Sequence, residues 1–412
     1  MSRQLTIALF AMTLTSASAS AQVNGPGPSD PNDFDTVINV PADQTSIVSV
    51  GNIDGSTTPT TQVNVADGGT LSGVVNAYGG SEINFSGGMI GTGGNSFVAN
   101  PGSEVNISGG SIGRFTALPD SLVNIRGGNI GTDYSQFLAY QGSRINISGG
   151  SFGGYLSFFL ANQGSQVSIS GGSFGGDFST FFVRGHGNAV NISGGSFGGD
   201  GSRFQVRGRS MVNVSGGRFG HVFEAGSDST VNISGGTFEY SLVAILGGSL
   251  SISGGSVERL SVDSESELNI SGGTVANELN AKAGSKVSLF GTEFFLDGVL
   301  LDSLTLHEAY LVEERGGQVL SGTLADGSAF DFILNGASVS EEDLFESGSV
   351  LTVTLVPEPA SAVLLLLASG ALLSRRRSTW LHSPAREPSA LAADFAKVKT
   401  STSYVVENGC GS

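Results

Sequence analysis

The sequence predicts an all-β fold, a parallel β-helix (β-solenoid) of about twelve coils followed by a small C-terminal β-module. Three observations predict it. A glycine doublet recurs at intervals of 18 to 23 residues, an apolar residue follows each doublet three positions later, and alternating apolar residues precede most doublets. A fixed repeat of this length indicates stacked units that share one core. We expect the solenoid over 36–291 and the module over 292–355.

The repeat keeps a constant internal register although its length varies. The doublets begin at positions 68, 87, 109, 127, 149, 171, 194, 216, 235, 254 and 272, and a Phe-Gly pair at 290–291 is a degenerate copy. We take the first glycine of each doublet, and Gly291 of the degenerate pair, as the marker of its repeat. The residues three positions after each marker are all apolar and should fill the interior: Leu71, Ile90, Ile112, Ile130, Phe152, Phe174, Phe197, Phe219, Phe238, Val257, Val275 and Phe294. Burial of each such side chain contributes about 1.5–3 kcal/mol.

The segments before the doublets have the pattern of strands with one buried face. Val105/Ile107 and Val190/Ile192 are typical of this period of two. A leucine-rich repeat has a similar length, but its Leu-x-Leu-x-x-Asn phrase is missing and no segment has helical periodicity. Each coil must turn at the same point, so the doublets should supply positive φ and avoid Cβ clashes between stacked turns.

The glycine-doublet repeat does not continue after the last doublet. Asp326-Gly327 separates two alternating runs, as the turn of a β-hairpin does. We expect the 292–355 module to cover the open end of the solenoid and to protect its unpaired strand edge.

A polar column stands three residues before each marker, from Asn84 onward. It consists of Asn84, Asn106, Asn124, Asn146, Ser168, Asn191, Asn213, Asn232, Ser251, Asn269 and Ser288. Seven of these asparagines lie in Asn-x-Ser triplets, which permits a glycosylation interpretation. Stacked amides between equivalent strands explain the register better. Because apolar residues flank it, the column should face outward, and Asn106, Asn146, Asn191, Asn213 and Asn232 are the candidate binding face.

Composition and charge exclude several classes. Residues 22–355 carry 12 Lys and Arg against 32 Asp and Glu, and an acidic surface of this kind repels the phosphates of nucleic acids. Cys410 is the single cysteine, so no disulfide forms within the chain. We expect no metal and no cofactor.

The N-terminus has the layout of a secretory signal peptide. Arg3 precedes an apolar run from Leu5 to Leu14, and Ala19 and Ala21 form a small-residue cleavage site. The alternative is an ordinary amphipathic helix. We expect export by the Sec machinery with removal of 1–21, followed by a flexible linker over 22–35.

The C-terminus carries a second targeting pattern. Pro357, Glu358 and Pro359 precede 14 apolar residues from Ala360 to Leu373 and then Arg375, Arg376 and Arg377. A helix of 14 residues spans about 21 Å, short of a bilayer core of about 30 Å. The arginines predict a cytoplasmic C-terminus.

The 356–378 segment closely resembles the PEP-CTERM sorting signal of bacterial exported proteins. The resemblance implies a transient stay in the inner membrane, cleavage near the triplet by an exosortase, and release to the cell surface or extracellular matrix. An uncleaved membrane anchor is the alternative. Such signals normally end the protein, whereas here a tail without recognisable pattern, expected to be disordered, follows over 379–412.

Two motifs raise the question of catalysis or calcium binding. Gly185-His186-Gly187 is similar to the Gly-His-Gly of polygalacturonases, with Arg184 and Arg207 close in sequence, but the paired acidic motifs of that family do not occur in the repeats. Asp177 and Asp200 follow phrases similar to the calcium-binding nonapeptide, yet they recur after 23 residues instead of nine. Solvent-exposed loop residues explain both motifs.

These observations favour a non-enzymatic, surface-sorted solenoid with a structural or adhesive role in the cell envelope or extracellular matrix. Extracellular polysaccharide and neighbouring surface proteins are the candidate partners. The alternative is a polysaccharide-binding or polysaccharide-degrading β-helix. Ice binding is a weaker variant, because the Thr-x-Thr arrays that favour it do not occur in the repeats.

Overall fold

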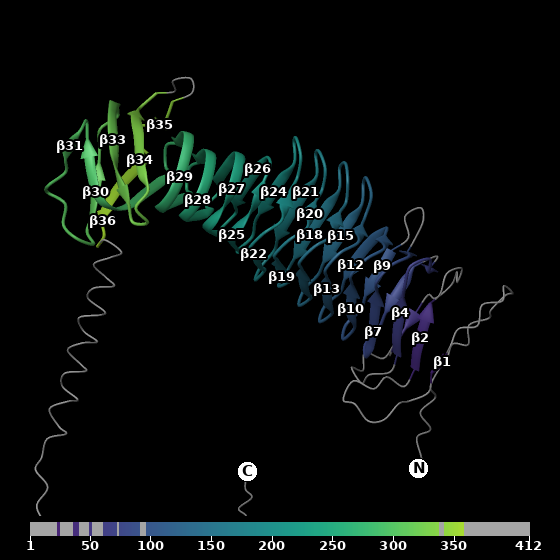
Figure 1. Cartoon of the computed structure of the whole chain (residues 1–412). Coiled ribbons are helices and arrows are strands. Elements are labelled where there is room, and N and C mark those ends of the chain that lie inside the picture. The colour runs from purple at the N-terminus through teal and green to yellow at the C-terminus, as the bar shows by residue number, and fades with distance from the viewer. Residues whose placement is uncertain are drawn as a thin grey trace, which may run out of the picture. The chain divides into compact units, whose positions relative to one another are not determined.

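The computed structural model describes residues 23–24, 36–40, 49–51, 61–71, 74–90, 96–337 and 342–357. These residues form an all-β parallel solenoid of about 11 turns with a C-terminal β-module (Figure 1). The predicted fold class is confirmed, with about 11 turns in place of about twelve. The signal peptide, most of the linker, the apolar stretch from Ala360 and the tail lie outside the described residues.

Each coil contains three strands, and equivalent strands of successive coils pair in parallel. The first strands, which carry the Asn/Ser column, are β2 (Thr36–Val40), β4 (Thr61–Val65), β7 (Ser81–Phe85), β10 (Glu104–Ile107), β13 (Leu122–Ile125), β16 (Arg144–Ile147), β19 (Gln166–Ile169) and β22 (Ala189–Ile192). The two-residue strands after the doublets are β5 (Thr70–Leu71), β8 (Met89–Ile90), β11 (Ser111–Ile112), β14 (Asn129–Ile130), β17 (Ser151–Phe152), β20 (Ser173–Phe174) and β23 (Ser196–Phe197). The third strands are β3 (Ser49–Val50), β6 (Val75–Ala77), β9 (Ser96–Ala99), β12 (Arg114–Ala117), β15 (Gln136–Ala139), β18 (Phe158–Asn162), β21 (Thr180–Arg184), β24 (Arg203–Val206) and β26 (Val222–Gly226).

In the later coils these strands merge into longer ones. They are β25 (Met211–Phe219), β27 (Thr230–Ile245), β28 (Ser249–Val262), β29 (Glu267–Ala281) and β30 (Lys286–Leu296). At the other end, β1 (Val23–Asn24) pairs antiparallel with β2. The first-strand positions keep their register from coil to coil, since Asn106 pairs with Asn124 and Asn124 with Asn146.

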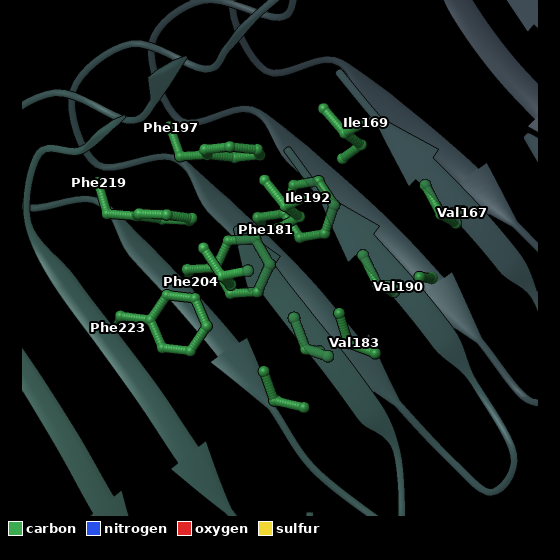
Figure 2. Packing of buried hydrophobic residues seen from close by; sticks show 14 of the residues in the cluster. Val167, Ile169, Phe181, Val183, Val190, Ile192, Phe197, Phe204, Phe219 and Phe223 are labelled. Atoms are coloured by element: carbon green, nitrogen blue, oxygen red, sulfur yellow. The ribbon is translucent and has the colours of Figure 1, made fainter. Parts of the chain in front are cut away.

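The interior contains two parallel columns of phenylalanine rings (Figure 2). The predicted column is confirmed, because Phe152, Phe174, Phe197, Phe219 and Phe238 stack with centroid separations of 4.6–4.8 Å. A second column comes from the third strands: Phe97, Phe115, Phe137, Phe159, Phe181, Phe204 and Phe223, at 4.2–5.2 Å. Rings of the two columns meet edge to face, as Phe197 and Phe204 do at 5.5 Å. Aromatic pairs favour both geometries.

One member of the predicted interior column is less buried than expected. Val275 is only partly buried, whereas Val257, its partner in the preceding coil, is 1% exposed. The register between β28 and β29 shifts immediately after this pair.

The glycines of each doublet have separate functions. In the pair Gly194-Gly195, the second residue has φ +98°, a conformation that favours glycine. The first residue lies so close to the coil below that a Cβ there would stand 2.4 Å from the carbonyl oxygen of Ser170. The doublet therefore permits both the sharp turn and the close stacking of turns, as the sequence predicted.

The C-terminal module continues the solenoid and then covers its end. β35 (Leu344–Phe345) and β36 (Val350–Leu355) add parallel pairings to β29 and β30. β33 (Gly316–Leu324) and β34 (Ala329–Asn335) form the predicted hairpin around Asp326-Gly327, and β33 pairs antiparallel with β30. β31 (Val299–Leu300) and β32 (Ala309–Val312) complete the module. β30 crosses the expected boundary at 291/292 without a break.

A buried carboxyl joins the last coil to the hairpin. The Asp343 Oδ1 accepts a hydrogen bond from the backbone N–H of Leu279 at 2.6 Å, and its Oδ2 accepts one from Ile333 at 2.8 Å. Burial raises the pKa of Asp343 from 3.8 to about 6, although the two N–H donors oppose this rise. Between these pH values the folded chain retains a proton that the unfolded chain releases.

This carboxyl should make the module less stable as the pH rises. The stabilisation from the retained proton is complete below about pH 4 and is lost as the pH rises through about 6. We expect the free energy of unfolding to fall by about 1–3 kcal/mol over this window relative to Asp343→Asn, which cannot ionise. Denaturant titrations of both proteins from pH 4 to 7 measure the difference. Parallel pH profiles would contradict the prediction.

Candidate functional site

The candidate binding face is built on a hydrogen-bonded ladder of asparagine amides. In each step, Nδ2 of one asparagine donates to Oδ1 of the equivalent residue in the preceding coil, at 2.9–3.1 Å. One segment of the ladder runs through Asn39, Asn64, Asn84, Asn106, Asn124 and Asn146, and a second through Asn191, Asn213 and Asn232. All five asparagines of the predicted face thus lie in one outward column. Asn39 and Asn64 extend it before its predicted start.

Ser168 separates the two segments. It occupies the ladder position between Asn146 and Asn191 but has no amide to continue the chain of bonds. A groove of about 410 Å³ lies over this break and is lined by Asn124, Asn146, Ser168, Asn191, Asn213, Arg126, Ser148, Ser170, Ser193, Ser215 and the intervening isoleucines. The hollow lies where the smaller serine replaces asparagine.

The chemistry of the groove is that of neutral hydrogen bonding. In the groove, Asn146 and Asn213 each use one amide N–H in the ladder, and their second N–H remains for a ligand. The amide of Asn124 also donates to Glu104 Oε1 at 3.4 Å. Neighbouring coils repeat at about 4.8 Å, so these groups recur at a fixed spacing. Arg126 is the single ionisable residue of the lining. This arrangement suits recognition of an extended polar partner and offers no pair of groups for general acid and base catalysis.

The residues of the Gly-His-Gly motif and its two arginines make separate contacts. Arg184 and Arg207 lie over the same ring, with their guanidinium carbons 5.7 and 5.9 Å from the centroid of Phe182. Arg207 also forms an ion pair with Glu224 at 2.7 Å. His186 is exposed, and within the described ranges it makes no hydrogen bond or ion pair.

The Gly-His-Gly motif has a structural explanation in the turn that contains it. Gly185 and Gly187 have φ of +93° and +76°, which glycine adopts without strain. The turn ends at Asn188, a buried residue whose Oδ1 accepts hydrogen bonds from the backbone N–H and the hydroxyl of Ser165, both at 3.1 Å. Its Nδ2 donates to the backbone oxygen of Arg184 and to Ser210. The positive φ of these two glycines therefore allows the backbone to make the turn that Asn188 ends.

The two aspartates considered for calcium take part in a loop contact. Asp177 Oδ1 accepts a hydrogen bond from the backbone N–H of Asp200 at 3.1 Å. Across the part of the chain that the structure describes, no cluster of three or more His, Cys, Asp or Glu side chains has metal-binding geometry.

The sorting-signal residues fall at the edge of the described chain. Pro357 is exposed and follows β36 by two residues. Glu358, Pro359, Arg375, Arg376, Arg377 and the N-terminal Ala19 and Ala21 lie outside the described residues. In the ranges given above, no helix is long and apolar enough to cross a membrane.

Sequence reasoning missed a second surface feature, at a different corner of the coils. Three successive coils carry an exposed aromatic residue on the loop between the two-residue strand (the short strand) and the third strand. These residues are Tyr134, Tyr155 and Phe178. Their rings meet edge to face at 5.9 Å. The exposed aromatic residues follow different markers by six or seven positions, which gave no fixed repeat to detect.

The fold and the face together define a β-solenoid with a regular polar surface. Comparison with protein-family models, with curated proteins and with solved structures gave no match in any of the three.

Proposed function

We propose that this chain is a non-enzymatic, exported β-solenoid that acts as a structural or adhesive component of the cell envelope or extracellular matrix. The observation that carries the proposal is the Asn/Ser ladder with its groove at Ser168. A regular, uncharged row of donors and acceptors complements a partner that is itself regular, such as an extracellular polysaccharide or a neighbouring surface protein. The acidic body argues against nucleic acid as a partner.

The route to the surface is proposed from the two ends of the sequence. The N-terminal pattern supports export by the Sec machinery, and the resemblance of 356–378 to a PEP-CTERM signal supports a transient stay in the inner membrane and cleavage by an exosortase. Pro357 is exposed just after the last strand, where a protease can reach it. Intact-mass analysis of the released protein should give a chain that ends near Pro357. A mass that includes residues 379–412 would contradict the cleavage.

The adhesive role is tested by placing charges in the ladder. We expect Asn146→Lys combined with Asn191→Lys to lower the surface-retained fraction of the protein about tenfold, the effect of losing about 1.4 kcal/mol of binding energy. Both side chains are exposed, so the lysines extend into solvent beside the groove. Retention is measured by protease shaving of intact producing cells and quantification of the culture medium.

The matched control carries the same charges on another face. Thr237→Lys with Ser256→Lys alters exposed positions of β27 and β28, away from the groove. This control should leave retention unchanged, and thermal unfolding confirms that both double variants are folded. Equal retention of the ladder variant and the wild type would refute the role of this face.

A further inference from the structure

We infer that the loops between the short and third strands of four consecutive coils form a binding strip for a neutral polysaccharide. The strip consists of Tyr134, Tyr155, Leu156 and Phe178, and Gly201 occupies the equivalent position in the fourth loop. This inference deepens the adhesive function proposed above, on which it depends for the class of partner. It adds a second contact surface for that partner, separate from the Asn/Ser face.

The strip has an unfavourable backbone conformation that core packing does not explain. Tyr134, Leu156 and Phe178 have φ of +60°, +52° and +57°, a region that bulky side chains rarely adopt. Gly201 adopts the same conformation at +69° without a side chain. Glycine would therefore satisfy the fold, yet three coils carry large apolar groups that are 44–64% exposed. Three such residues on consecutive loops, with rings that contact one another along the strip, motivate a functional hypothesis.

The loops are held rigidly by a buried column of serines. Ser157, Ser179 and Ser202 each donate through Oγ to a backbone carbonyl of the preceding coil's loop, at 2.8–3.0 Å. Ser157 and Ser202 also accept a hydrogen bond from a backbone N–H of their own loop. A ligand that binds this strip has little loop entropy to offset, since the loops are already ordered.

The pattern of the strip matches the two surfaces of a sugar ring. Aromatic faces pack against the C–H groups of a pyranose, and carboxylates accept hydrogen bonds from its hydroxyl groups. The exposed carboxylates of Asp133 and Asp177 lie on the loops of Tyr134 and Phe178, and that of Asp200 lies on the fourth loop beside Gly201. The rings of Tyr134, Tyr155 and Phe178 follow one another at 5.9 Å, so one extended chain can contact them in turn.

Charge and size select a neutral glycan among the possible occupants. Loops 131–135, 153–157, 175–179 and 198–202 contain three Asp and no Lys or Arg, on a body with an excess of acidic residues. Anionic polysaccharides and a second copy of this chain are therefore repelled. A stable protein partner commonly needs about 800 Å² from 20–30 residues on each side, which four side chains do not supply.

The test is affinity electrophoresis of the secreted protein in gels that contain hydroxyethyl cellulose, laminarin or dextran, with alginate as the anionic probe. We expect retardation by at least one neutral polysaccharide and an affinity loss of about tenfold or more in Tyr134→Gly combined with Phe178→Gly. Phe178→Leu, which keeps an apolar side chain, should also bind more weakly. The glycine variant should unfold at the same or a higher temperature, because it relieves the positive φ.

The matched control is Leu246→Gly. Leu246 is also bulky, 61% exposed and at φ +53°, but it lies in the turn between β27 and β28. It should bind like the wild type. Absence of retardation by all three neutral probes, retardation by alginate alone, or equal binding by the Tyr134/Phe178 variant would overturn the strip. A wild-type dimer that dissociates in the Tyr134/Phe178 variant would also overturn the strip as a glycan site.

The two proposals fail separately. Glycan binding that is lost in the Asn146/Asn191 variant and kept in the Tyr134/Phe178 variant would overturn the strip and leave the Asn/Ser face supported. Surface retention that is unchanged in the Asn146/Asn191 variant, together with glycan binding that is lost in the Tyr134/Phe178 variant, would overturn the role of the Asn/Ser face and leave the strip supported.

Discussion

Phe197→Ala is expected to lower the free energy of unfolding by about 3–5 kcal/mol. The Phe197 ring stacks on Phe174 and Phe219 at 4.7 and 4.8 Å and meets Phe181 and Phe204 edge to face. Removal of this ring opens a cavity where the two columns meet, and the strands above and below cannot close it without loss of backbone pairing. Denaturant titration followed by far-ultraviolet circular dichroism measures the loss.

The control for this substitution is an exposed ring in a loop of the preceding coil. Phe178 is 53% exposed, so Phe178→Ala removes a similar side chain without opening the core. Its effect should stay within about 0.5 kcal/mol, as for most surface changes. If Phe197→Ala were no more destabilising than Phe178→Ala, the columns would not be the main source of stability.

The first column could be predicted because it keeps a constant distance from the glycine doublet. Phe174 and Phe197 follow their markers by three residues in every case, since the turn geometry allows no insertion between them. The second column lacks this constancy. Phe115 follows its marker by six residues and Phe137 by ten, because some coils contain a longer loop before the third strand. This variable loop hides the period in the sequence although the rings stack regularly in space.

The same reasoning separates the predictable and unpredictable parts of the candidate face. The outward column of amides follows from its position between two buried apolar residues, and the hydrogen-bonded ladder confirms that geometry. The groove was not predictable from the sequence pattern. It depends on Ser168, which looked like a conservative member of the column, and on serines of neighbouring coils that sequence analysis left without a role.

Gly194→Ala is expected to lower the free energy of unfolding by about 3 kcal/mol, through a steric clash alone. Gly194 does not have positive φ, so alanine fits its backbone conformation. The added Cβ would stand 2.4 Å from the Ser170 carbonyl oxygen, which is backbone and cannot move without shifting a whole coil. Thermal unfolding of the variant measures the cost, and circular dichroism at low temperature shows whether the solenoid still forms.

Gly187→Ala separates this clash from backbone strain. Gly187 has φ +76°, but a Cβ there would find its nearest neighbouring atom 3.9 Å away. Alanine at this position should therefore cost only about 1 kcal/mol, the strain of positive φ. The difference between the two variants measures how strongly contact between turns at the doublets sets the coil spacing. If Gly187→Ala proved the more harmful, backbone conformation and not close stacking would account for the recurrence of the first glycine.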